Sequence, residues 1–119
     1  MITVFGIKNC DTVKKSLKWL DANNISYEFY DYKKLPPKRE WLIEQIEQHG
    51  LDTIVNKRGT TYRKLDDSVK ASLDVDTAPN LLVENPSMIK RPILCHQNKP
   101  KAKSLVGFKS EQYEQFFNE

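Results

Sequence analysis

The chain has 119 residues, of which 39% are hydrophobic and 29% charged, and its formal net charge is +3. This length suits one domain with one core, and the lack of a run of about 18 apolar residues argues against a membrane-spanning helix. The 15 lysines and 4 arginines are spread along the chain, which indicates a solvated surface rather than a patch that binds nucleic acid. Because the first residues already follow a strand pattern, we expect no signal peptide and a cytoplasmic protein with a single domain over residues 1–119.

Residues 2–20 predict a strand, a tight turn and an amphipathic helix. The run at 2–5 is β-branched and aromatic, and Gly6 ends it. Hydrophobic side chains then recur with the 3.6-residue period of a helix, at Val13, Leu17 and Leu20. The Asn23-Asn24 pair stops this helix, and the aromatic stretch at 25–32 predicts a second strand. The order strand, helix, strand indicates a βαβ unit with parallel strands.

Cys10 lies where the predicted helix begins. Asn9 is a favourable N-cap residue, which would place Cys10 in the first turn, where unpaired backbone N–H groups and the helix dipole favour a thiolate. A lone cysteine is otherwise commonly a small buried hydrophobe without chemistry. Two features argue against that interpretation. The flanking residues are polar, namely Lys8, Asn9, Asp11 and Thr12, and the turn between a strand and a helix is where α/β folds place their sites.

The middle of the chain predicts helices separated by loops. A loop with two prolines at 33–37 precedes a helix whose hydrophobic residues are Trp41, Leu42, Ile43 and Ile46. Gly50 then closes that helix as a C-terminal glycine. Residues 51–59 read as a connection that ends in a polar loop. Further helical pieces are expected at 62–65, at 69–73 and at 80–84, the last opened by residues 77–79 and ended by Pro86.

The end of the chain predicts a hairpin and a last helix. Strands are expected at 93–96 and 104–108, joined by a loop at 97–101. Ser110 is expected to cap the final helix, whose hydrophobic face would be Tyr113, Phe116 and Phe117. The layout β-α-β, helical middle, β-β-α predicts a mixed four-stranded sheet with helices on both faces, in the α/β or α+β class.

Three further residues are candidates for a role at a site around Cys10. Pro92 either begins the third strand as an ordinary proline or forms a cis peptide bond in a tight turn beside Cys10. Arg58 and Arg91 lie in predicted loops, where exposed arginines commonly serve no specific purpose. If both reach Cys10, they would bind an anionic substrate and stabilise the thiolate.

The other cysteine and the two histidines do not indicate a metal site or a catalytic dyad. Cys95 and His96 are neighbours in a predicted strand, so their side chains point to opposite faces and cannot act on one metal or as a pair. We expect Cys95 to be a buried structural residue and His49 to lie at the surface. The sequence shows no metal-ligand spacing, glycine-rich phosphate loop or GxSxG elbow.

Four stretches in order carry a resemblance to a known family: FGIKNCDTVKKSLKWL at 5–20, HGLDTIVNKRGTTYRKL at 49–65, NPSMIKRPIL at 85–94 and VGFKSEQY at 106–113. The chain resembles the ArsC/Spx family over its whole length, and within it the small YffB-like proteins. The resemblance implies an α/β, thioredoxin-like fold. Its mixed four-stranded sheet would have the order β-α-β … β-β-α, with a helical insertion at about 35–85.

The resemblance also implies a site and an activity. Cys10 would be the redox nucleophile, Arg58 and Arg91 would share the catalytic work as anion-binding residues, and Pro92 would be the cis proline. Substrate-binding positions would be Asn9, Asp11, Thr12 and Pro92. The activity implied is a glutathione-dependent thiol–disulfide oxidoreductase that acts on a small anionic or disulfide substrate, with glutathione as co-substrate and no metal.

Two alternatives follow from the same family. One is an Spx-like transcriptional regulator that contacts the α-subunit of RNA polymerase without binding nucleic acid itself. Gly50 matches a glycine of that contact, although a helix C-cap explains it equally well. The other is an arsenate reductase. Val13 stands where redox-switched Spx proteins have the second cysteine of Cys-x-x-Cys, and Gly107 stands where arsenate reductases have a third arginine.

Overall fold

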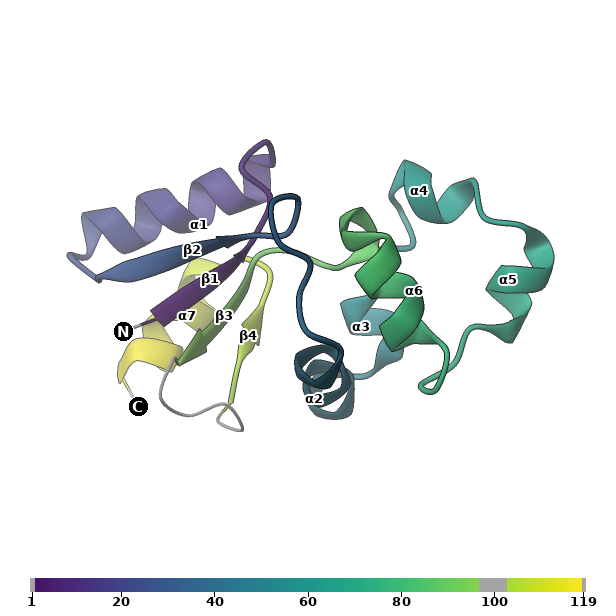
Figure 1. The fold of residues 1–119 in the computed structure, drawn as a ribbon. Coiled ribbons are helices and arrows are strands. Elements are labelled where there is room, and N and C mark those ends of the chain that lie inside the picture. Colours follow the sequence, from purple (N-terminus) through teal and green to yellow (C-terminus); the bar gives the residue numbers. More distant parts are fainter. Residues whose placement is uncertain (1, 97–102, 119) are drawn as a thin grey trace. The chain divides into compact units, whose positions relative to one another are not determined.

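The computed structural model describes residues 2–96 and 103–118 and divides into two compact units. The sheet unit combines residues 1–31 with 91–119, and the helical unit is 32–90. The sheet unit holds all the strands of the sheet, and the helical unit holds a series of short helices (Figure 1). The predicted loop at 97–101 lies outside the described residues.

The sheet has four strands in the order β2-β1-β3-β4: β1 (Ile2–Gly6), β2 (Tyr27–Asp31), β3 (Ile93–His96) and β4 (Leu105–Val106). Strand β1 runs parallel to β2 and antiparallel to β3, which in turn pairs antiparallel with β4. The predicted βαβ unit and hairpin are therefore confirmed. Strand β4 is shorter than predicted, because the next residue, Gly107, has a φ of +86°, which an extended strand does not allow.

The first helix, α1 (Asp11–Ala22), buries the side that its periodicity predicts. Val13 and Leu20 are fully buried and Leu17 is partly buried, with Ser16 buried between them. The helix stops at Asn23-Asn24 as expected. Asn24 has a positive φ of 57°, and the N–H of Ile25 donates to the carbonyl of Leu20, which satisfies an end carbonyl of the helix.

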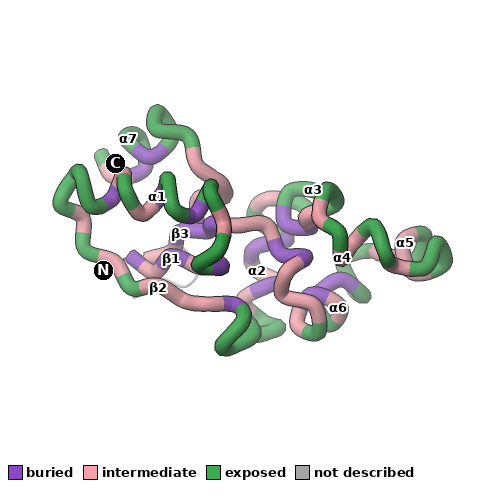
Figure 2. Tube along the Cα trace, turned by 90° about the horizontal axis from the view of Figure 1, so that it is seen from above, coloured by how far each residue is buried: buried purple, intermediate pink, exposed green. Residues whose placement is uncertain are grey.

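One face of the sheet carries the core of the sheet unit. The buried residues of this core come from β1, β3, α1 and α7 (Ser110–Asn118), namely Ile2, Val4, Leu20, Leu94, Tyr113 and Phe116. Figure 2 shows buried positions within each of these elements, between exposed ones. The rings of Trp19 and Tyr113 meet edge to face at 5.3 Å, so α1 and α7 pack against each other. Both helices of the sheet unit therefore cover the same face of the sheet, and the expectation of helices on both faces stays a prediction.

The final helix also begins differently from the prediction. It begins at Ser110, and its first backbone hydrogen bond runs from the N–H of Tyr113 to the carbonyl of Lys109 at 3.1 Å. Lys109 therefore holds the cap position, and Ser110 lies in the first turn. The predicted hydrophobic face is confirmed, with Tyr113 and Phe116 buried and Phe117 packed at the edge of the core.

The helical unit contains α2 (Arg39–His49), α3 (Leu51–Ile54), α4 (Thr60–Arg63), α5 (Asp67–Ser72), α6 (Ala78–Glu84) and the 3₁₀ turn η1 (Pro86–Met88). Helix α3 corrects the prediction of a plain connection at 51–59. Gly50 has a φ of +89°, which ends α2 and lets a new turn begin at once, while Ile54 becomes fully buried. Val55 then pairs with Ile89, flanked by two backbone hydrogen bonds of 2.7 Å.

Candidate functional site around Cys10

Cys10 is the N-cap residue of α1. Its backbone is extended, with φ −145° and ψ 123°, and its carbonyl accepts the N–H of Lys14 at 3.0 Å. The prediction that Asn9 caps the helix is therefore wrong by one residue. The Cys10 side chain makes no capping hydrogen bond. As the N-cap residue, Cys10 lies at the end of α1 where the first-turn N–H groups have no helical carbonyl as acceptor, and such groups favour an anion.

The residues around Cys10 are polar and exposed. Cys10 is partly exposed, and the flanking Lys8, Asn9, Asp11 and Thr12 are exposed, as the polar flanks predict. The chain enters this turn through the buried Gly6 and Ile7. A Cβ on Gly6 would lie 2.9 Å from Cγ2 of Val13, so only glycine lets the end of β1 approach α1 this closely.

Three loops leave the sheet at the same end as Cys10. Phe5 pairs with Ile93, and Ile93 pairs with Val106, so the turn after β1, the residues before β3 and the residues after β4 share this end. The Arg91–Pro92 peptide bond is cis, as one of the two interpretations of Pro92 expects. The N–H of Gly107 donates to the carbonyl of Pro92 at 2.8 Å, which joins two of these loops.

A buried hydroxyl network connects this end of the sheet to α1. The hydroxyl of Tyr113 donates to the carbonyl of Gly107 at 2.8 Å. Because this bond uses the one hydrogen of the Tyr113 hydroxyl, the Ser16 hydroxyl is the donor in the second bond, to the Tyr113 oxygen at 2.7 Å. Burial raises the pKa of Tyr113 to about 12, so the donor stays protonated. The sequence interpretation missed this network; the available signal was a serine on the hydrophobic face of α1.

The two arginines fall in different units. Arg91 belongs to the sheet unit, directly before Pro92, and is partly buried with its Nε atom enclosed. Arg58 belongs to the helical unit and is exposed in the turn before α4. Its backbone N–H donates to Oδ1 of Asn56 at 3.3 Å. The roles of both arginines remain predictions.

Cys95 differs from its prediction. It is partly exposed rather than buried, and it pairs with Thr3, on the face opposite to Val4 and Leu94. His96 points the other way and stacks on Phe116 at 5.2 Å, which confirms that the two neighbours face apart. Because Cys95 and α1 lie on opposite faces of the sheet, Cys10 and Cys95 are not placed for an internal disulfide.

His49 is also partly buried rather than at the surface, and burial lowers its pKa. Within residues 2–96 and 103–118, no cluster of three His, Cys, Asp or Glu side chains is arranged to hold a metal ion. In the same described ranges, no helix has the length and hydrophobicity needed to cross a membrane.

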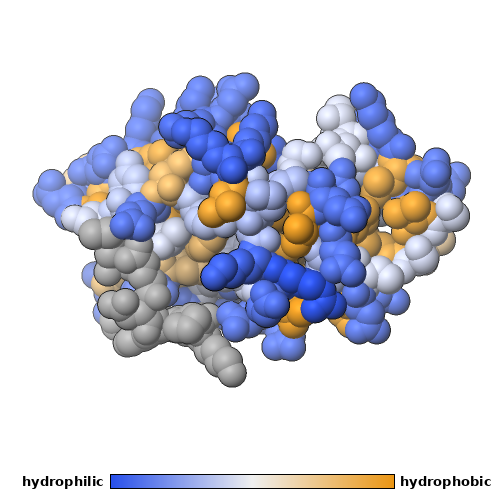
Figure 3. Space-filling view, viewed as in Figure 1, coloured by the Kyte–Doolittle hydropathy of each residue, from blue (hydrophilic) through white to orange (hydrophobic). Residues whose placement is uncertain are grey.

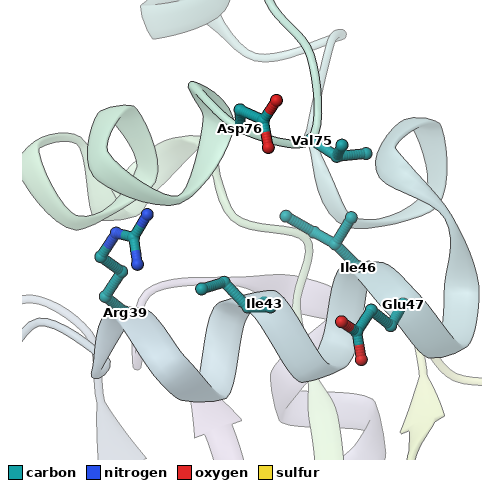
Figure 4. A pocket seen from close by; sticks show the side chains of 6 residues that line it. All are labelled: Arg39, Ile43, Ile46, Glu47, Val75 and Asp76. Atoms are coloured by element: carbon teal, nitrogen blue, oxygen red, sulfur yellow. The ribbon is translucent and has the colours of Figure 1, made fainter.

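The helical unit contains a separate cavity of about 270 Å³ (Figure 4). Four lining residues come from α2 and two from the loop before α6, namely Arg39, Ile43, Ile46, Glu47, Val75 and Asp76. The Arg39 Nε donates to Oδ1 of Asn80 at 2.9 Å, so this guanidinium is engaged within the unit. None of the predicted site residues lines the cavity.

A mixed sheet in the order β2-β1-β3-β4, with a cysteine at the start of the first helix and a cis proline before β3, defines a thioredoxin-like α/β protein. The solved structure described as the YFFB protein shares this fold, with a TM-score of 0.88 and 43% identity over 97% of each chain. A model of the ArsC family matches residues 5–116, and the chain belongs to that family.

Two curated relatives cover nearly the whole chain. A Haemophilus influenzae protein described as uncharacterized is 49% identical over 98% of this chain and 99% of its own length. The global transcriptional regulator Spx of Streptococcus mutans is 25% identical over 98% of this chain and 82% of its own length. The predicted kinship with both ArsC and Spx proteins is confirmed.

Proposed function

We propose that the protein is a thiol–disulfide oxidoreductase in which Cys10 is the nucleophile and glutathione is the reductant. The observation that carries the proposal is the position of Cys10, a partly exposed residue at the N-cap of α1, where no side chain caps the N–H groups of the first turn. Membership of the ArsC family supports a thiol-based reaction. We place the reaction in the cytoplasm, where glutathione keeps thiols reduced.

The reaction consists of two thiol–disulfide exchanges. The Cys10 thiolate attacks the glutathione sulfur of a mixed disulfide, the S–S bond breaks, and the substrate thiolate leaves with the electron pair. A second glutathione thiolate then attacks the glutathione sulfur of the Cys10 adduct, which releases glutathione disulfide and restores Cys10. Because Val13 replaces a second cysteine and Cys95 lies on the far face of the sheet, the resolving thiol comes from outside the chain.

Binding the anionic substrate is assigned to residues around Cys10. Arg91 supplies a cation directly before Pro92, and the exposed Asn9, Asp11 and Thr12 supply polar groups beside the sulfur. Arg58 enters the proposal through the family resemblance alone. Charge-assisted hydrogen bonds that position the substrate accelerate such a reaction more than a change in thiolate fraction does, because orienting the two sulfur atoms removes more of the barrier.

The test compares Cys10→Ser with Cys95→Ser as the matched control. Turnover of a glutathione–mercaptoethanol mixed disulfide is followed by coupling glutathione disulfide production to glutathione reductase. Cys10→Ser should abolish turnover and the glutathione adduct that mass spectrometry detects on the native protein, whereas Cys95→Ser should keep both. Equal loss in the two variants would contradict the proposal and indicate an internal disulfide.

The regulator interpretation is kept as a second candidate because of the similarity to Spx. It predicts that the isolated C-terminal domain of the RNA polymerase α-subunit binds the protein, that Cys10→Ser leaves binding intact and that a bulky residue at position 50 abolishes it. Arsenate reduction predicts oxidation of glutathione that depends on arsenate. Gly107 carries no side chain to provide a third cation, so we expect no such oxidation.

A further inference from the structure

A row of cations runs along α1 from Cys10. Lys14 and Lys18 follow Cys10 by four and eight residues, which places the three on one ridge of the helix. Both lysines are exposed, and neither forms a salt bridge within the described residues. Side chains on a helix lean toward its N-terminus, so these ammonium groups lean toward Cys10. Figure 3 shows hydrophilic side chains along the outer edge of α1.

The acidic residues of α1 leave this row positive. Asp11 lies three residues before Lys14 and four before Lys15, so its carboxylate is a helix neighbour of both and offsets part of the positive charge near Cys10. Residues 8–22 still carry four lysines against these two aspartates, Asp11 and Asp21. Asp21, three residues after Lys18, interacts with the Tyr27 hydroxyl, whose pKa is raised by burial and by this carboxylate. The exposed Lys8 adds a further cation on the other side of Cys10.

We propose that Lys14 and Lys18 select acidic polypeptides as substrates, specifically peptides whose cysteine is joined to glutathione and followed by carboxylates at alternate positions. The proposal rests on Cys10 as the proposed nucleophile. At about 1.5 Å per residue, the two lysines lie about 6 and 12 Å along α1 from Cys10. An extended peptide places its second and fourth following residues about 7 and 13 Å from its cysteine, on one side.

The spacing also separates a peptide from glutathione alone. Glutathione has one glycine after its cysteine, about 3.5 Å of backbone, and one γ-linked glutamate before it, roughly twice that length, so neither of its carboxylates extends as far as the fourth following residue of a peptide. The chemistry is unchanged from the proposed function. Cys10 attacks the glutathione sulfur, the peptide thiolate leaves, and a second glutathione restores Cys10 with release of glutathione disulfide.

The test uses two synthetic peptides that carry glutathione on their cysteine, Cys-Gly-Glu-Gly-Glu and the neutral Cys-Gly-Gln-Gly-Gln. We measure kcat/KM at low salt for the native protein and for Lys14→Gln, Lys18→Gln and Lys15→Gln. Lys15→Gln is the matched control, because it removes the same charge from the same helix on a different ridge. Each of the first two variants should lower kcat/KM for the acidic peptide about threefold, which is the factor for two unit charges about 7 Å apart in water.

The neutral peptide should react equally with all variants, and the preference for the acidic peptide should vanish in about 1 M salt, where the screening length is about 3 Å. Equal losses in Lys14→Gln and Lys15→Gln would overturn the inference, and so would the absence of any preference in the native protein. Turnover that survives Cys10→Ser would instead refute the proposed function. If Cys10→Ser is inactive but the native protein uses both peptides equally, only the proposed role of Lys14 and Lys18 is refuted.

Discussion

Replacing Tyr113 by phenylalanine tests the buried network that joins α1 to the end of β4. The substitution removes one oxygen and keeps the ring that packs against Trp19 and Phe108. Two hydrogen bonds are lost, one from the Ser16 hydroxyl at 2.7 Å and one to the Gly107 carbonyl at 2.8 Å. Ser16 can turn its hydroxyl to a carbonyl of the preceding helical turn, so Gly107 bears most of the cost.

Leaving a buried polar group without its partner costs about 1–3 kcal/mol, and because Gly107 is only partly buried we expect Tyr113→Phe to lose about 1–2 kcal/mol of unfolding free energy. Equilibrium urea unfolding, followed by tryptophan fluorescence and circular dichroism, measures the loss. Tyr27→Phe is the control, because its ring is only partly buried and its hydroxyl faces Asp21 rather than the core.

A double-mutant cycle separates the network from packing. If Ser16 and Tyr113 interact as the structure shows, Ser16→Ala combined with Tyr113→Phe should cost less than the sum of the single losses, by at least about 0.5 kcal/mol. Strict additivity, or a loss for Tyr113→Phe no larger than that for Tyr27→Phe, would refute the reasoning.

Four other outcomes are expected. Gly6→Ala should lose about 1–3 kcal/mol of unfolding free energy by overpacking against Val13, and a loss under about 0.5 kcal/mol in urea unfolding would contradict the 2.9 Å approach. Gly50→Ala should lose about 1–3 kcal/mol of unfolding free energy, because φ +89° and ψ 153° suit glycine alone. A Cβ at this position meets no atom within 4 Å, so the loss measures backbone strain and not steric overlap. Burial lowers the pKa of His49, so the unfolded chain takes up the proton first and stability falls as the pH drops below about 6.5. His49→Gln should reduce this fall between about pH 7.5 and 5.5. If the urea midpoint changes between these two pH values by the same amount in the variant as in the native protein, the prediction is contradicted. Arg91→Gln should raise the KM for glutathione mixed disulfides about tenfold, which corresponds to the loss of one charge-assisted hydrogen bond. The control Arg63→Gln, at an exposed residue, should leave KM unchanged. Equal effects of the two substitutions would remove Arg91 from the proposal.

Local patterns in the sequence determined the elements around Cys10. The spacing of Val13 and Leu20 identified the buried side of α1, and Gly50 identified the end of α2, because helical periodicity and positive φ depend on residues a few positions apart. The strand order around the first helix followed from the same local signals and the handedness of βαβ units.

Tertiary structure decided what those patterns could not. Whether Asn9 or Cys10 caps α1 depends on which carbonyl accepts the first helical hydrogen bond. The close approach of β1 to α1 at Gly6 determines that position. The partner of Ser16 lies 97 residues away, so no local pattern contains it. Cys95 is partly exposed on one face of the sheet because α1 and α7 both pack on the other, and which face a helix covers is determined only when distant elements assemble.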